Sequence, residues 1–177
     1  MLRFVLCLCV VLLSQAASAQ VPTDVKLEKP DHPVVKMTTD AGEMVLELYP
    51  EDAPKHVEAF LTLTGKGFYN GLIFHRVVPG FVIQGGDPKG DGTGGPGYKL
   101  PAEFNARPHE KGTLAMARSE DPNSAGSQFY ICLDRIPHLD NSYTVFGKVV
   151  KGLDVPEKVK QGDKMQIIVL QGASAKK

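Results

Sequence analysis

Apolar and polar residues alternate most regularly between residues 34 and 48. The alternation runs through two stretches, 34–39 and 43–48, which the turn-forming sequence Asp40-Ala41-Gly42 separates. A period of two is typical of a strand that buries one face, and two such strands around a short turn form a hairpin. We therefore expect a β-hairpin in this region.

A helical period follows the hairpin. Asp52 is a suitable N-cap, and segment 53–64 repeats its apolar positions at helical spacing up to the stop signal Gly65. A second, shorter helix is expected over 155–160, where Pro156 suits the first turn. The other apolar runs have the length of strands, at 73–78, 113–117, 128–133, 143–150 and 165–170. Many short strands with one or two helices favour a mainly β fold, a closed antiparallel barrel.

The first 19 residues have the pattern of a secretory signal peptide. Arg3 precedes an apolar run over 4–13, and Ala17-Ser18-Ala19 provides a small-residue cleavage site. The run is too short to span a bilayer, which needs about 20 apolar residues. We expect cleavage near Gln20 and a periplasmic or secreted protein. The expected regions are a signal peptide over 1–19, an extended leader over 20–33, one domain over 34–171 and a disordered C-terminal end over 172–177.

Composition limits the classes of partner and of cofactor. The formal net charge is zero, so nothing indicates nucleic acid, or a membrane after signal cleavage, as a partner. Cys7 and Cys9 lie inside the predicted signal, which leaves Cys132 as the only thiol and excludes an intramolecular disulfide. Cys132 lies in an apolar run and is interpreted as a core residue. The histidines show no zinc-site spacing, and we expect no metal.

The glycine-rich segment 90–97 formally matches Gly-x-Gly-x-x-Gly. In a dinucleotide-binding fold that motif joins a strand to a helix, whereas residues 96–101 show no helical period. A calcium loop is also excluded, because Lys89 and Tyr98 stand where metal ligands would be needed. A tight surface loop is the preferred interpretation.

A single arginine stands in the mostly apolar stretch that follows the predicted helix. Arg76 stays charged at any working pH and offers a rigid fork of donors, so it can orient or polarise a ligand but cannot serve as a proton reservoir. Strand alternation would place Phe74, Arg76 and Val78 on one face. A cation between two apolar groups suits a partly dry pocket.

Residues 74–87 form a long and irregular motif, Phe-His-Arg-Val-Val-Pro-Gly-Phe-Val-Ile-Gln-Gly-Gly-Asp. With the blocks 112–117, 126–131 and 145–149, this motif resembles the signature of cyclophilins, the peptidyl-prolyl isomerases. The resemblance covers the chain from about residue 34 to residue 170. It implies an eight-stranded β-barrel capped by two α-helices, a substrate groove on the outer surface, and no cofactor.

The resemblance also assigns roles by position. Arg76 looks like the catalytic arginine, and Gln84 like the residue that helps to hold the substrate backbone. The other expected substrate-binding residues are Phe81, Val82, Ala117, Gln128, Phe129, Tyr130, Leu139 and Tyr143. For Phe81 and Phe129 the sequence alone does not decide between a substrate contact and a place in the hydrophobic core. Because alternation separates Phe81 from Gln84, their joint use requires a bend or bulge near Gly85.

We expect a monomeric peptidyl-prolyl isomerase that acts on proline-containing polypeptides and assists folding in an exported compartment. The alternative is a proline-peptide binding module or chaperone with little turnover; the intact Arg76, Phe81 and Gln84 favour the enzyme. Tyr130 stands where phenylalanine is usual, and His138 where the best-known members carry the tryptophan associated with cyclosporin binding. We therefore expect weak cyclosporin affinity with catalysis retained.

Overall fold

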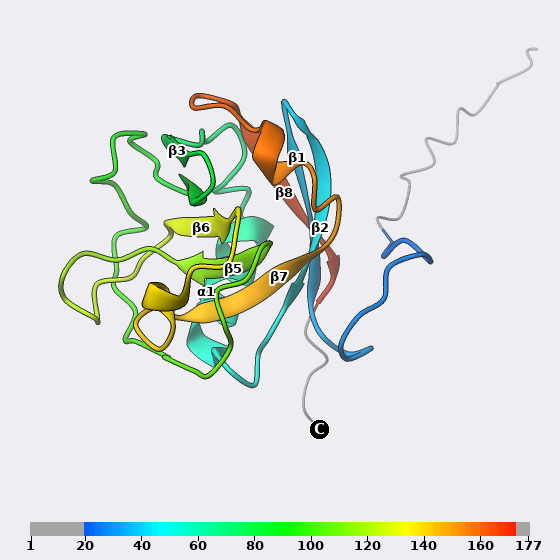
Figure 1. Ribbon diagram of the computed structural model, residues 1–177, viewed down its shortest axis with the longest axis horizontal. Coiled ribbons are helices and arrows are strands. Elements are labelled where there is room, and N and C mark those ends of the chain that lie inside the picture. The colour runs from blue at the N-terminus through cyan, green and yellow to red at the C-terminus, as the bar shows by residue number, and fades with distance from the viewer. Residues whose placement is uncertain (1–19, 173–177) are drawn as a thin grey trace, which may run out of the picture.

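The computed structural model describes residues 20–172, which build one curved antiparallel sheet of eight strands (Figure 1). In chain order the strands are β1 (Val34–Thr39), β2 (Gly42–Leu48), β3 (Arg76–Val78), β4 (Val82–Gly85), β5 (Thr113–Met116), β6 (Phe129–Cys132), β7 (Val145–Lys151) and β8 (Met165–Gln171). Across the sheet the order is β3-β4-β6-β5-β7-β2-β1-β8. Strands β1 and β2 form the expected hairpin. The predicted signal peptide and residues 173–177 of the predicted C-terminal end lie outside the described residues.

Among residues 20–172 the one α-helix is α1 (Pro54–Gly65), which confirms the predicted helix to within one residue. Its start differs from the prediction, because Ala53 occupies the N-cap and no side chain caps the helix. The Asp52 carboxylate instead accepts a hydrogen bond of 2.5 Å from the Arg107 guanidinium. Within residues 20–172, no helix is long and apolar enough to cross a membrane.

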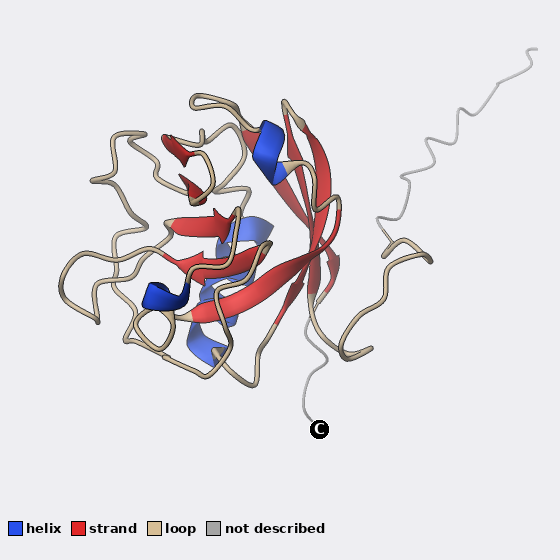
Figure 2. Ribbon diagram, viewed as in Figure 1, coloured by secondary structure: helices blue, strands red, loops and turns tan. Residues whose placement is uncertain are grey.

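The expected second α-helix is replaced by a 3-10 turn. Figure 2 shows α1 as the long helix, with two short turns, η1 (Pro137–Leu139) and η2 (Pro156–Lys158), elsewhere. The η2 turn ends because Val159 takes an extended conformation and buries its side chain in the core. Burial of the Val159 side chain in the core therefore prevents the helix that the sequence pattern predicts here.

The sheet forms a half-barrel and is not the closed barrel that was expected. Strands β3 and β8 lie at its two edges and do not pair as strands. The irregular backbone before β3 lies beside β8 instead, where Gly71 N–H donates to Met165 O and an isolated bridge joins Ile73 to Lys164. Gly71 has a φ of 81°, a left-handed conformation that favours glycine and interrupts a regular strand at this point.

Each face of the sheet carries its own apolar cluster. The large core lies between the inner face and α1, where the Phe60 ring packs 5.7 Å from Phe129 and 5.3 Å from Phe146. A smaller cluster covers the outer face of the central strands and consists of Val82, Ala115, Tyr130, Cys132, Ile136 and Val145. Alternation along β4 and β6 therefore separates residues that support the fold from residues that face outward.

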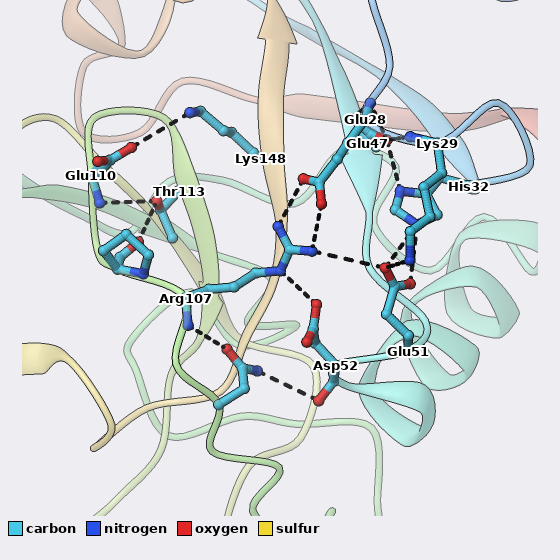
Figure 3. A network of polar contacts seen from close by, with 12 residues as sticks. Glu28, Lys29, His32, Glu47, Glu51, Asp52, Arg107, Glu110, Thr113 and Lys148 are labelled. Carbon is cyan, nitrogen blue, oxygen red and sulfur yellow. Dashed lines mark hydrogen bonds and ion pairs between the residues drawn. The ribbon is translucent and has the colours of Figure 1, made fainter.

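The predicted leader over 20–33 is bound to the domain by a buried carboxylate and a half-buried arginine (Figure 3). Glu47, which is 1% exposed, accepts hydrogen bonds from the backbone N–H groups of Glu28 and Lys29. His32 Nδ1 lies 2.7 Å from the same carboxylate. Arg107 bonds Glu28 through both Nη atoms, at 2.9 and 3.0 Å. The leader thus supplies partners for a carboxylate that would otherwise be buried alone.

Candidate functional site

A short hairpin of β3 and β4 places Arg76 directly opposite Gln84. Cross-strand partners project from the same face, and the Arg76 guanidinium donates a 3.3 Å hydrogen bond to Gln84 Oε1. The hairpin reverses at Gly80, whose φ of 70° lies in the left-handed region that favours glycine. This turn, before β4 begins, brings Phe81 to the site, so no bend near Gly85 is needed.

The aromatic neighbour of Arg76 is Phe81 and not Phe74. The Arg76 guanidinium carbon lies 5.6 Å from the Phe81 ring centroid. Phe74 is fully buried in the inner core, whereas Arg76 is exposed. The expectation that both share one face was wrong, because β3 begins only at Arg76 and strand alternation does not extend back to Phe74.

A groove of about 320 Å³ lies on the outer face of the sheet, and we call it the Arg76 groove. It is lined by Arg76, Phe81, Val82, Gln84, Ala117, Arg118, Tyr130, Leu139 and Tyr143. The register explains the assembly, since Arg76 lies opposite Gln84, and Gln84 lies opposite Tyr130. The groove combines the exposed Arg76 and the half-buried Arg118 with mostly apolar and aromatic walls, which suits an apolar ligand whose polar edge needs a donor.

A second groove of about 470 Å³ adjoins the first and includes part of the glycine-rich loop. It shares Gln84, Ala117 and Arg118 with the Arg76 groove and also contains Gln128. Arg118 therefore borders both grooves, and the sequence prediction missed it. Its guanidinium lies 4.5 Å from the Tyr143 ring centroid and donates to Ser142 O. The sequence could have indicated Arg118, because it is a permanent cation directly next to the predicted groove residue Ala117.

Phe129 does not reach either groove, which corrects one predicted substrate contact. It is fully buried on the inner face of β6, where its ring packs against Phe60 and Tyr69. Its neighbour Tyr130 points to the outer face, as strand alternation requires. Of the two alternatives that the sequence allowed for Phe129, the structure therefore shows the core residue.

Side-chain amides connect the arginine to the glycine-rich loop. Gln84 accepts from Arg76, and its amide nitrogen donates to Gln128 Oε1 at 3.1 Å. The Gln128 amide nitrogen in turn donates to Gly92 O and Gly94 O, both at 2.9 Å. The loop itself is held by the buried Asp87 carboxylate, which accepts backbone N–H groups of the loop. The donors of the site are thus fixed before a ligand arrives.

Two ionisable groups near the groove are held in their neutral forms. Burial raises the pKa of Tyr130 well above its ordinary value, so the phenol keeps its proton. Burial also raises the pKa of Cys132 to about 12, which makes this thiol a poor nucleophile. The interpretation of Cys132 as a core residue is confirmed. The Arg76 groove therefore presents two arginines and the Gln84 amide, and no activated nucleophile.

These features define a half-barrel protein with a preorganised, donor-bearing apolar groove on its outer face. The sequence model of the family "Cyclophilin type peptidyl-prolyl cis-trans isomerase/CLD" matches residues 34–172. A Helicobacter pylori peptidyl-prolyl cis-trans isomerase is 47% identical over 139 residues, which cover 76% of this chain and 85% of that protein. Peptidyl-prolyl cis-trans isomerase B of Bacillus subtilis is 47% identical over 135 residues, covering 75% and 94%. The chain therefore belongs to the cyclophilin-type peptidyl-prolyl cis-trans isomerases, a family of enzymes.

Solved structures agree with this assignment. A cyclophilin type peptidyl-prolyl cis-trans isomerase from Cryptosporidium parvum superposes with a TM-score of 0.73 at 32% identity, covering 80% of this chain and 99% of that chain. The same protein was also solved in the presence of the dipeptide Ala-Pro, and that structure superposes with a TM-score of 0.72. The eight-stranded half-barrel and α1 thus form a cyclophilin fold.

Proposed function

We propose that the Arg76 groove binds proline-containing polypeptides and that Arg76 catalyses rotation about the X-Pro bond. The observation that carries this proposal is the position of Arg76. Its guanidinium lies beside an apolar pocket and is oriented by the cross-strand partner Gln84. The Ala-Pro dipeptide used with the Cryptosporidium relative supports a proline-containing ligand.

The residues of the groove suit a reaction in which no covalent bond breaks. Amide resonance gives the peptide bond a rotation barrier of about 18–20 kcal/mol, and X-Pro bonds cross it over tens to hundreds of seconds. When the bond twists, the prolyl nitrogen becomes pyramidal and its lone pair becomes a better acceptor. A donor from Arg76 at that nitrogen stabilises the twisted state more than the planar ground state, which lowers the barrier.

The apolar walls hold the proline ring while the other side of the bond turns. Phe81, Val82, Tyr130 and Leu139 would form this pocket, and the Gln84 amide would hold the substrate backbone beside it. Because the amide chain already fixes Gln84, little conformational freedom is lost when the substrate binds. Gln84 is therefore already oriented to receive a substrate backbone.

The test compares the cis-to-trans rate of a short X-Pro peptide with the parent protein, Arg76→Ala and Arg76→Lys, after circular dichroism shows that all three are folded. We expect Arg76→Ala to reduce kcat/KM by about 100-fold or more, as removal of a preorganised donor does. Arg76→Lys keeps the charge but loses the fork, so an intermediate rate is expected. Full activity of folded Arg76→Ala would refute the assignment.

A proline-peptide binding module is the competing function. It would bind the same peptide in the same groove and leave the isomerisation rate unchanged. Titration of a fluorescent X-Pro peptide, run beside the kinetic assay, separates the two. Binding without acceleration by the parent protein would favour the module.

We also propose that the protein acts in a periplasm or along a secretory route, where it assists folding of other chains. The support is the sequence of the first 19 residues, with its short basic start, apolar run and Ala-Ser-Ala site. Mass spectrometry of the protein recovered from cell fractions tests this. The expected mature form begins near Gln20 and lies in the exported fraction, and an intact cytoplasmic form would contradict it.

A further inference from the structure

Tyr130 lines the Arg76 groove, but its hydroxyl bonds to a group inside the protein. The oxygen lies 2.9 Å from Nε2 of His109, whose side chain is fully buried. The two rings are nearly parallel, with centroids 6.0 Å apart and an angle of 18°. Because the hydroxyl is satisfied internally, the pocket wall stays apolar although tyrosine stands where the family usually has phenylalanine.

The other side of His109 is held by a carboxylate. Its Nδ1 lies 3.1 Å from Oδ1 of Asp140, and the same oxygen accepts the His109 backbone N–H at 2.8 Å. Asp140 is fixed in turn by an ion pair with Arg135. An ionised carboxylate can only accept, so Nδ1 carries the imidazole proton and Nε2 is left to accept the Tyr130 hydroxyl proton.

The surroundings of His109 stabilise this protonation state. Burial lowers the pKa of His109, although the hydrogen bond to Asp140 opposes the effect. Arg135 and His138 act in the same direction as burial, and the Tyr143 ring packs with its centroid 6.5 Å from that of His109. The order carboxylate, imidazole, hydroxyl is also that of a nucleophilic triad. Here, however, the phenol is protonated and buried, so the arrangement holds a ring in place and does not activate an attacking group.

We propose that His109 is a positioning residue of the isomerase, which fixes the Tyr130 ring in the wall of the proline pocket through the tyrosine hydroxyl. The proposal rests on the proposed function of the Arg76 groove and adds a determinant of substrate binding behind it. The hydrogen bonds of His109 also fix the part of the groove wall that Leu139 forms, because Asp140 directly follows Leu139 in the chain. Three separate segments of the chain are therefore tied together behind the substrate.

Three variants separate this role from a purely structural one. His109→Asn keeps a group near the Nδ1 position that can bond Asp140, but it is too short to reach Tyr130. His109→Gln places an amide near the Nε2 position and can still bond the tyrosine hydroxyl. Tyr130→Phe removes the hydroxyl alone. The readouts are KM and kcat for an X-Pro peptide, the peptide Kd, and ¹⁵N spectra of the imidazole.

We expect His109→Asn and Tyr130→Phe each to raise KM about fivefold and to change kcat less than about twofold. One lost neutral hydrogen bond has this effect when it weakens the binding of ground state and transition state equally. The double variant should equal either single variant, and His109→Gln should restore most of the affinity. The ¹⁵N spectrum of the parent should show a protonated Nδ1 and an unprotonated Nε2.

Additive effects in the double variant, or unchanged KM in folded His109→Asn, would overturn the positioning role. A protonated Nε2 in the parent would overturn it too. If the parent protein accelerates nothing, the isomerase function fails by itself. The peptide Kd across the same variants then decides the positioning role, with the same expected pattern and the same contrary outcomes.

Discussion

At the residue scale, the groove depends on amide groups with one fixed orientation. Gln128 accepts from Gln84 through its oxygen and donates to Gly92 O and Gly94 O through its nitrogen. Rotating the amide by half a turn would set its nitrogen against the Gln84 donor and its oxygen against two carbonyl oxygens. The hydrogen bonds therefore specify the orientation of Gln84 and, through it, of Arg76.

Gln128→Glu tests this chain with almost no change of shape. A carboxylate cannot donate a hydrogen bond, so the variant would lose the bonds to Gly92 O and Gly94 O. We expect this loss to release the glycine-rich loop from the groove wall. We expect kcat/KM for an X-Pro peptide to fall about threefold to tenfold. Gln166→Glu, at an exposed position on β8, makes the same chemical change elsewhere and should have no effect. Equal activity of both variants would show that the amide chain does not matter.

His138 determines the drug response that we expect of this chain. Its exposed ring stacks on Phe81, with centroids 5.9 Å apart and an angle of 5°. A tryptophan at this position would offer a larger aromatic face and an N–H donor beside the groove. We expect His138→Trp to bind cyclosporin more tightly while peptide isomerisation is retained. Inhibition curves for parent and variant measure this, and equally strong inhibition of the parent would contradict it.

The predicted groove residues differ in how well the sequence located them. Arg76, Phe81 and Gln84 belong to one continuous motif, so their proximity needs only a short hairpin. Phe129 could not be placed in the same way, because one residue of register decides between core and groove. Arg118 was missed because its place beside the groove depends on a distant segment as well as on the neighbouring Ser119 O and Glu120 O. Its guanidinium also donates to Ser142 O and lies over the Tyr143 ring.

At the element scale, close strand contact explains a glycine with no special backbone conformation. A Cβ added at Gly147 on β7 would lie 2.6 Å from Glu47 O on β2, and also close to Leu48 and Leu114 side chains. A backbone oxygen in a paired strand cannot move away cheaply. The β2–β7 pairing therefore requires glycine here for reasons of space.

Gly147→Ala is expected to lower the free energy of unfolding by about 1–3 kcal/mol, the usual cost of overpacking. Gly65→Ala is the matched control, because nothing lies within 4 Å of its added Cβ and the residue ends α1. That change should be neutral or stabilise by up to about 1 kcal/mol. Urea unfolding of the two variants measures both, and equal midpoints would argue against the close contact.

Local patterns predicted the long elements better than the short ones. The hairpin and α1 are each specified by many residues, and both were predicted correctly. The expected helix over 155–160 had fewer than two turns of sequence, so burial of Val159 could override it. Strand β4 is only four residues long and was not predicted as a separate strand.

At the scale of the whole molecule, the two faces of the sheet have different tasks. The inner face and α1 supply the core, whereas the outer face supports the Arg76 groove with a smaller cluster. The openness of the sheet could not be predicted, because it depends on the backbone near Gly71 meeting β8, a contact between segments far apart in the sequence. Attachment of the leader through Glu47 depends on similarly distant contacts.

Buried histidines make the stability of the whole domain depend on pH. Burial lowers the pKa of His56 and of His109 from the ordinary 6.5, although Glu103 and Asp140 oppose the shifts through hydrogen bonds. Burial likewise lowers the pKa of His75. Below about pH 6.5 the unfolded chain therefore binds more protons than the folded protein, and acidification favours unfolding.

The expected result is a fall in the free energy of unfolding between pH 7.5 and pH 5.5, measured by urea unfolding at a series of pH values. Carboxylates contribute in a separate, more acidic window. Burial alone would raise the pKa of Glu51, but the hydrogen bond from Lys29 helps to lower it to about 2, so the contribution of Glu51 to stability is lost only below its ordinary pKa of 4.5.

His56→Gln removes one buried titrating group and should make the dependence of the free energy of unfolding on pH shallower. Replacing the exposed His138 by Gln is the control, because it removes a histidine without touching the core. A stability that is constant across this range, or a slope that His56→Gln leaves unchanged, would show that the buried histidines are not the cause.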